Sequence, residues 1–184
     1  MLVSARLGVN KAQNAVGNMY RDGLGVPQDY RIAMKWYLKA AKQGNTSAQV
    51  NIGVLYQDGE GVPQDYAQAM EWFLKAAEQR NADAQNNIAF LYRSGYGVPR
   101  NDTLAIEWFR RAADQGDTSA QHSIGWLYEY GKGLPKDKTK AMEWYKKAAD
   151  GGDADAEMQL DTLEKQSHRI QVDKKLSEVV DESF

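Results

Sequence analysis

Few side chains in this sequence could carry out chemistry. The 184 residues contain two histidines, His122 and His168, and no cysteine. The lack of cysteine excludes a thiolate nucleophile, a thiolate metal site and a disulfide. A metal site would then need carboxylates around one histidine, and the pattern assembles no such group. Carboxylates are plentiful, but no pair stands out in an apolar setting as a general acid and base would. We therefore predict no catalytic residue, no metal site and no cofactor.

Repeated glycine pairs of the form Gly-x-Gly raise the question of a phosphate-binding loop; they begin at Gly23, Gly59, Gly95 and Gly131. A dinucleotide-binding loop needs a third glycine and a preceding strand. Other residues stand where the third glycine would be needed, namely Gln28, Gln64, Arg100 and Lys136. No strand is predicted before any of the four pairs. These turns are therefore predicted to shape the chain rather than to bind phosphate.

The overall composition is that of a folded, water-soluble chain. Hydrophobic residues make up 42% and charged residues 26%, and the formal net charge is -2. That charge gives no general attraction to nucleic acid or to anionic membranes. No apolar run approaches the ~18 residues that a membrane-spanning helix needs, so we expect no direct membrane insertion. The first residues are too few and too polar for a secretory signal, which favours a cytoplasmic location and leaves secretion open.

The strongest pattern is an internal repeat with a period of 36 residues. All four prolines keep this spacing, as Pro27, Pro63, Pro99 and Pro135. Four of the five tryptophans do the same, as Trp36, Trp72, Trp108 and Trp144. The six residues Gly-Val-Pro-Gln-Asp-Tyr occur twice without change, from Gly25 and again from Gly61. A period of this length is typical of arrays of stacked helical units.

Each unit reads as two helices joined by a turn, which the second unit illustrates. Apolar residues recur at helical spacing over 48–58 and again over 66–79. Gly59 ends the first helix, because glycine accepts a positive φ, and Pro63 prevents the helix from continuing. Asp65 stands where the second helix needs a side-chain cap for its free N–H groups. The twice-written hexapeptide is therefore predicted to be the joint of the unit.

Three positions depart from the repeat, and one of them, Asn101 in place of the capping aspartate, is a mild change. Arg80 stands where the other units have a helix-ending glycine, at Gly44, Gly116 and Gly152. A positive φ at Arg80 would cost roughly 1 kcal/mol, and Asn81 is the alternative residue for that conformation. Ala89 stands where the other units have Gly17, Gly53 and Gly125.

The repeated pattern resembles the Sel1-like repeat, a family related in shape to the tetratricopeptide repeats. It reads Ala-Gln-x-x-Ile-Gly-x-Leu-Tyr, then Gly-x-Gly-Val-Pro-x-Asp, then Ala-Met-x-Trp, and covers Ala12 to Gly152. The resemblance implies an all-α, right-handed superhelical solenoid whose first helices line the concave side. It also implies work as a non-catalytic adaptor or scaffold. Some bacterial relatives with paired cysteines bind β-lactams, and the lack of cysteine argues against that branch.

We therefore predict four helix-turn-helix repeats over 12–47, 48–83, 84–119 and 120–153. Residues 1–11 are predicted to be the end of an incomplete preceding repeat. Residues 154–184 are predicted to form a capping helix and tail that covers the open apolar face of the last repeat. An apolar stripe of Val172, Leu176, Val179 and Val180 continues along this helix.

Positions that vary between units, on the first-helix face opposite the packing stripe, are candidates for binding a partner. We predict that this concave face consists of Asn14, Asn18, Arg21, Val50, Asn51, Val54, Gln57, Asn86, Asn87, Phe90, Arg93, His122, Trp126, Glu129 and Tyr130. Trp126 is the one tryptophan outside the 36-residue spacing, and Phe90, Trp126 and Tyr130 could form an aromatic platform. The alternative is that Phe90 and Trp126 only pack between adjacent first helices, and the two roles are compatible.

These observations favour a protein-interaction module that binds a peptide or a partner helix in the concave groove, within a larger complex and without nucleic acid. One alternative is a secreted or periplasmic repeat protein with hydrolase-like activity. The other is a structural spacer cut from a longer repeat array.

Overall fold

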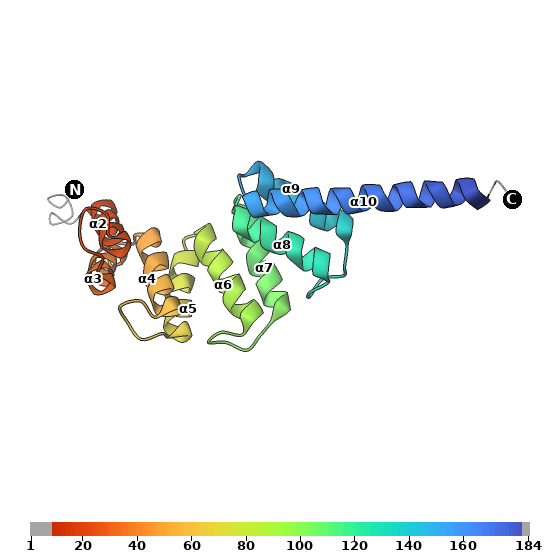
Figure 1. Cartoon of the computed structure of the whole chain (residues 1–184). Helices are drawn as coiled ribbons and strands as arrows, with labels where there is room; N and C mark the ends of the chain where they lie inside the picture. Colours follow the sequence, from red (N-terminus) through yellow and green to blue (C-terminus); the bar gives the residue numbers. More distant parts are fainter. Residues whose placement is uncertain (1–8, 182–184) are drawn as a thin grey trace. The chain divides into compact units, whose positions relative to one another are not determined.

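The chain is all-helical over the part that the structure describes. The computed structural model describes the backbone of residues 9–181 and the side chains of residues 9–173. Within residues 9–181 the chain forms nine helices and no strand (Figure 1). The helices are α2 (Asn10–Asp22), α3 (Tyr30–Ala41), α4 (Thr46–Asp58), α5 (Tyr66–Ala77), α6 (Ala82–Ser94), α7 (Asp102–Ala113), α8 (Thr118–Tyr130), α9 (Lys138–Asp150) and α10 (Ala154–Asp181). The predicted all-α fold of repeated helix pairs is confirmed.

Two compact units divide the chain, Met1–Ala112 and Ala113–Phe184. In the first unit, each second helix of a pair packs on the first helix of the next pair. The apolar face of α3, with Tyr37 at its centre, buries Ile52 and Leu55 of α4. The face of α5, with Phe73 at its centre, buries Ile88 of α6 in the same way. Small alanine side chains separate these large ones and let the helix axes approach closely.

The second unit is built from α8, α9 and α10. Tyr145 of α9 is fully buried in a cluster with Ala156 and Leu163 of α10. The first turns of α10 therefore cover the apolar face of α9, as predicted for a capping helix. Beyond them, α10 extends away from α8 and α9 (Figure 1), and Val172 is exposed. The rest of the predicted apolar stripe consists of Leu176, Val179 and Val180, whose side chains lie outside the described residues.

The repeated hexapeptide is a joint in the structure. Gly59 has φ +73° and its N–H donates to the carbonyl of Leu55, which ends α4. The N–H of Asp65 donates to the carbonyl of Tyr56 over 2.9 Å and closes the turn. The Asp65 carboxylate then accepts from the N–H groups of Ala67 and Gln68 and caps α5. The predictions that the glycine ends the first helix and that the aspartate caps the second are confirmed.

Arg80 adopts the left-handed conformation that glycine adopts at the equivalent positions of the other repeats. Its φ is +60°, and no other non-glycine residue in the described part of the chain has a positive φ. Asn81 has φ -69° and instead caps α6, with its side-chain oxygen accepting from the N–H of Ala84 over 2.8 Å. The alternative that Asn81 takes the positive φ is therefore wrong, because Asn81 is needed in an extended conformation to cap the next helix.

Replacing Arg80 with glycine is expected to raise the free energy of unfolding by about 0.5–1 kcal/mol. Glycine removes a left-handed strain of about 1–2 kcal/mol, and its greater backbone entropy in the unfolded chain offsets part of that gain. The side chain of Arg80 is exposed, so few contacts are lost. Thermal unfolding followed by circular dichroism checks this result. The Arg80→Ala variant is the matched control, since it removes the same side chain but keeps the strain. An equal gain in both variants would show that the backbone is not responsible.

Candidate partner-binding surfaces

The predicted polar residues of α2 and α4 form one hydrogen-bonded network in the first unit. Asn51 of α4 lies at its centre, and its Nδ2 donates to Oδ1 of Asn14 over 3.1 Å and to Oδ1 of Asn18 over 3.2 Å. The Oδ1 of Asn51 accepts from Nη1 of Arg21 over 3.2 Å. The structure therefore brings together four residues that the sequence analysis singled out separately.

Further partners hold this network in place. The hydroxyl of Tyr37 donates to Oδ1 of Asn18 over 2.8 Å. Tyr37 is fully buried, and burial raises its pKa to about 12, so the hydroxyl stays a neutral donor. Arg21 pairs with Asp22 at 2.7 Å, and this hydrogen bond raises the pKa of Arg21 and lowers that of Asp22. The asparagine side chains are thus held in one arrangement.

The predicted residues in the middle of α4 are less accessible. Val50 is buried in the cluster around Phe73 and is not available to a partner, so its assignment to a binding surface is corrected. Its helix is packed on two sides, which a single apolar stripe does not reveal. Val54 is half-buried against the same cluster. Gln57 is also half-buried, and its Nε2 donates to the carboxylate of Asp58 over 3.4 Å.

The α6 residues combine polar and aromatic groups. Asn87 donates to the carbonyl of Asp83 over 2.9 Å, and Asn86 is half-buried on the same helix. Phe90 packs, half-buried, against the cluster around Phe73. The guanidinium of Arg93 lies 5.7 Å from the centre of the Phe90 ring, and burial lowers the pKa of Arg93. Phe90 therefore packs within its own unit.

An aromatic stack beside α6 was missed by the sequence analysis. Tyr96, in the turn after α6, stacks on Tyr66 with ring centres 4.7 Å apart and planes 20° apart. The edge of Tyr96 also meets Phe90 at 5.9 Å. Tyr96 is 43% exposed. The sequence does contain a sign of this stack. The equivalent positions hold Leu24, Glu60 and Lys132, so an aromatic residue occurs at this position in one repeat only.

Four predicted residues lie on α8 in the second unit. Trp126 is half-buried, packs against the cluster around Tyr145, and lies 5.1 Å from the ring of Tyr130. Tyr130 is 50% exposed. Glu129, between them in sequence, accepts from the Tyr145 hydroxyl over 2.7 Å. Phe90 belongs to the first unit and these rings to the second, and their shared platform stays a prediction.

His122 links α8 to the start of α10. Its Nδ1 lies 3.3 Å from Oδ2 of Asp153, whose other oxygen accepts from the N–H of Ala156 and caps α10. The edge of the His122 ring meets Tyr145 at 5.3 Å between ring centres. These contacts give His122 a structural role. Among the described side chains, no three histidine, aspartate or glutamate residues gather as metal ligands would.

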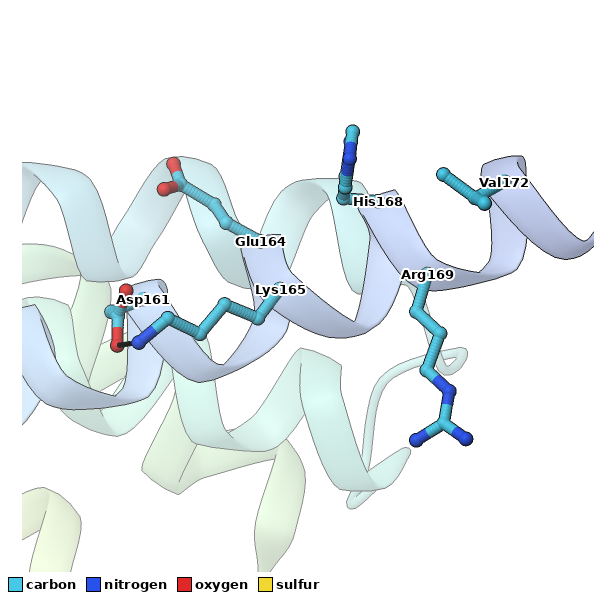
Figure 2. A pocket seen from close by; sticks show the side chains of 6 residues that line it. All are labelled: Asp161, Glu164, Lys165, His168, Arg169 and Val172. Atoms are coloured by element: carbon cyan, nitrogen blue, oxygen red, sulfur yellow. Dashed lines mark hydrogen bonds and ion pairs between the residues drawn. The ribbon is translucent and has the colours of Figure 1, made fainter.

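Two hollows are found on the described surface, one on α10 and one beside the amide network. One, of about 540 Å³, runs along α10 and is lined by Asp161, Glu164, Lys165, His168, Arg169 and Val172 (Figure 2). All of its lining residues come from a single helix, and Lys165 pairs with Asp161 at 2.6 Å. The other, of about 470 Å³, is lined by Asn10, Lys11, Asn14, Gly44, Asn45, Thr46, Ser47 and Gln79. It adjoins the amide network through Asn14.

None of the helices in the described residues combines the length and the apolar character that a membrane span requires.

The fold defines a protein built from repeated helix pairs, and the repeats identify its family. The Sel1 repeat model matches residues 10–45, 46–81, 82–117 and 118–153, so the chain belongs to the Sel1 repeat family. Proteins of this family are typically interaction scaffolds and are generally non-catalytic. A search of the curated proteins found no match.

Several solved structures resemble the chain, two of them described as Sel1-type repeat proteins. A Sel1 repeat protein from Oxalobacter formigenes is 40% identical, with a TM-score of 0.78 over 84% of this chain and 63% of that one. A protective antigen of uropathogenic Escherichia coli with the same repeat fold is 41% identical, with a TM-score of 0.80 over 89% of this chain and 35% of that one. An immunity protein from Pseudomonas aeruginosa is 25% identical, with a TM-score of 0.62 over 82% of this chain and 56% of that one. The chain thus spans less than two thirds of each of these proteins.

Proposed function

We propose that the protein is a non-catalytic interaction scaffold that binds a peptide or a partner helix on the predicted concave face of the first helices, which are α2, α4 and α6 in the first unit and α8 in the second. One observation carries the proposal. Residues that pack the repeats recur every 36 positions, whereas the first-helix faces differ from repeat to repeat. Residues that pack identical repeats against one another are expected to be the same in every repeat. Residues that recognise one partner are expected to differ between repeats. Membership of the Sel1 repeat family supports the same reading.

The surfaces of the two units would contribute in different ways. In the first unit, the network around Asn51 is held by internal hydrogen bonds before a partner arrives. A surface that is already ordered loses little conformational entropy when it binds. In the second unit, Tyr130 is exposed and is supported by the half-buried ring of Trp126. Exposed aromatic rings with such support commonly dominate binding energies.

Replacing Tyr130 with alanine is expected to weaken partner binding by roughly tenfold or more, because an aromatic anchor contributes about 2 kcal/mol. Partners are first identified by affinity purification and mass spectrometry with the wild-type chain. The dissociation constant is then measured with the purified partner by calorimetry. The melting temperature is expected to change little, since half of the Tyr130 side chain already faces solvent.

The Met158→Ala variant is the matched control, because Met158 is an exposed apolar residue of the same unit but lies on α10. Its affinity is expected to equal that of the wild type. Equal binding by all three proteins would exclude Tyr130 as an anchor. A wild-type chain that retains no partner would contradict the proposal and favour the spacer hypothesis. Turnover of a substrate by the purified chain would favour the hydrolase hypothesis instead.

A further inference from the structure

Glu129 stands at a position where helix electrostatics disfavour an acid. The equivalent residues in the first and third repeats are Arg21 and Arg93, and each is a basic residue in the last turn of its helix. Basic residues are favourable there, because the C-terminal end of a helix carries partial negative charge. In α8 the last turn holds no basic residue and instead contains Glu129. A local disadvantage of this kind is expected where a residue serves binding.

The hydrogen bond from Tyr145 orients the Glu129 carboxylate but does not require its charge. The hydroxyl of Tyr145 donates to Oε2 of Glu129 over 2.7 Å, and Tyr145 is fully buried. In the first repeat, Tyr37 is the buried equivalent of Tyr145. Its hydroxyl donates to Oδ1 of Asn18, a neutral amide, over 2.8 Å. A neutral acceptor therefore suffices for this hydroxyl. The bond from Tyr145 therefore gives no reason for the negative charge of Glu129.

No cation of the described residues neutralises Glu129. Salt bridges in that part of the chain, such as Arg21–Asp22, His122–Asp153 and Lys165–Asp161, do not include Glu129. The charge of Glu129 also raises the pKa of the neighbouring Tyr130, so the carboxylate lies within electrostatic reach of that ring. A half-exposed carboxylate and an exposed aromatic ring therefore lie side by side with no cation between them.

A carboxylate beside an aromatic face is suited to a cationic side chain. The ammonium or guanidinium group gains an ion pair from the carboxylate and a cation–π contact from the ring. The same unit already contains such aromatic contacts, with Nζ of Lys147 lying 4.1 Å from the centre of the Trp144 ring and Nζ of Lys140 lying 5.5 Å from that of Tyr128. Charge complementarity over a longer range points the same way. Residues 113–184 hold fifteen acidic and ten basic residues, against ten and thirteen in residues 1–112.

We propose that Glu129 and Tyr130 bind a lysine or arginine side chain of a partner's peptide segment. This inference rests on the proposed scaffold function and specifies the chemistry of the partner. The carboxylate, oriented by Tyr145, pairs with the cation, and the ring of Tyr130 covers one side of it. Trp126 supports the ring of Tyr130 from the side of the core.

A random twelve-residue peptide library displayed on phage tests the proposal with the full chain as bait. The wild-type chain is expected to enrich peptides that carry lysine or arginine at one shared position. The Glu129→Gln variant keeps an acceptor for Tyr145 and removes the charge, so it is expected to lose that enrichment. A synthetic peptide from the wild-type selection should bind Glu129→Gln at least tenfold more weakly, measured by fluorescence anisotropy. Replacing its basic residue with glutamine should weaken binding to the wild type by a similar factor.

Two controls separate charge from structure. Glu157→Gln removes an exposed acid from α10 and should leave the affinity unchanged. Tyr145→Phe removes the hydroxyl but keeps the carboxylate charge, so the preference for a basic residue should survive. Added salt should weaken binding to the wild type and have little effect on Glu129→Gln.

The outcomes distinguish the two proposals. Enriched peptides without a shared basic residue, or equal affinities of wild type and Glu129→Gln, would overturn the cation site and leave the scaffold function standing. A wild-type chain that enriches no peptide and retains no protein partner would overturn both.

Discussion

Replacing Gly61 with alanine is expected to lower the free energy of unfolding by about 3 kcal/mol, because the new methyl group meets backbone atoms at a residue with positive φ. A Cβ at Gly61 would lie 2.7 Å from Cβ of Tyr30, 2.8 Å from its carbonyl carbon and 2.9 Å from the backbone nitrogen of Arg31. These atoms form the start of α3, in the preceding repeat, and backbone atoms cannot move aside cheaply. Gly61 also has φ +72°, which adds left-handed strain of about 1–2 kcal/mol for any other residue.

The chain contains a matched control for this substitution. Gly25 is the equivalent glycine of the first repeat and has φ +73°, but a Cβ there would meet no atom within 4 Å. Gly25→Ala should therefore show the backbone strain alone, about 1–2 kcal/mol. The difference between the two variants measures the close approach of one repeat to the next. Thermal unfolding should separate them by several degrees, and identical melting temperatures would contradict the contact.

Replacing Gly53 with alanine is expected to lower the free energy of unfolding by about 2 kcal/mol, as overpacking of a core commonly does. A Cβ at Gly53 would lie 2.5 Å from Cε1 and 2.7 Å from Cδ1 of Phe73, whose ring is fully buried. The sign of the effect is informative. In a helix interior alanine is ordinarily more favourable than glycine by about 1 kcal/mol. A loss of stability at Gly53 therefore reports the ring contact rather than helix propensity.

Two further variants make this test specific. Ala89 is the equivalent residue of the third repeat, and Ala89→Gly should cost about 1 kcal/mol because no overpacking is relieved. Combining Gly53→Ala with Phe73→Leu removes the ring edge and should give a combined loss smaller than the sum of the two single losses. Urea unfolding provides the free energies for this comparison. A Gly53→Ala variant more stable than the wild type would show that the ring accommodates the methyl group.

Gly53 and Gly61 illustrate the difference between repeated positions, which serve packing, and variable positions, which are candidates for binding. Gly53 and Gly61 are needed because a ring or a backbone of a neighbouring helix lies against them. Packing governs which residues such positions accept, including the fully buried Ala89 of the third repeat, so they carry no information about a partner. Tyr130 and Glu129 occur in one repeat only, and the packing of the other repeats does not need them. We therefore expect residues that occur in one repeat only to be the ones that contact a partner.

Most of the helix positions could be predicted from the sequence. The predicted first helix 48–58 is observed as Thr46–Asp58, and the predicted second helix 66–79 as Tyr66–Ala77. The start differs by two residues because Asn45 caps the helix, with its side-chain oxygen accepting from the N–H of Ala48.

The contacts of the candidate surfaces could not be predicted in the same way. Val50 was assigned to a surface because it lies off the main apolar stripe of its helix, yet α4 is covered on a second side and Val50 is buried there. Asn14, Asn18 and Asn51 were predicted only as residues of the binding face, and the sequence does not reveal that Asn51 bonds to the other two. Each of these facts depends on a residue of another helix.

By itself, the sequence determined the repeat of 36 residues, the all-α class, the joints and the residues that break the pattern. Those features depend on backbone preferences and on apolar spacing within a helix, which nearby residues set. Only the tertiary structure decided that Gly61 touches the start of α3, that Arg80 bears the positive φ, and that a buried tyrosine orients Glu129. Contacts of this kind join helices that are distant in sequence, and side-chain packing, which no local pattern encodes, selects them.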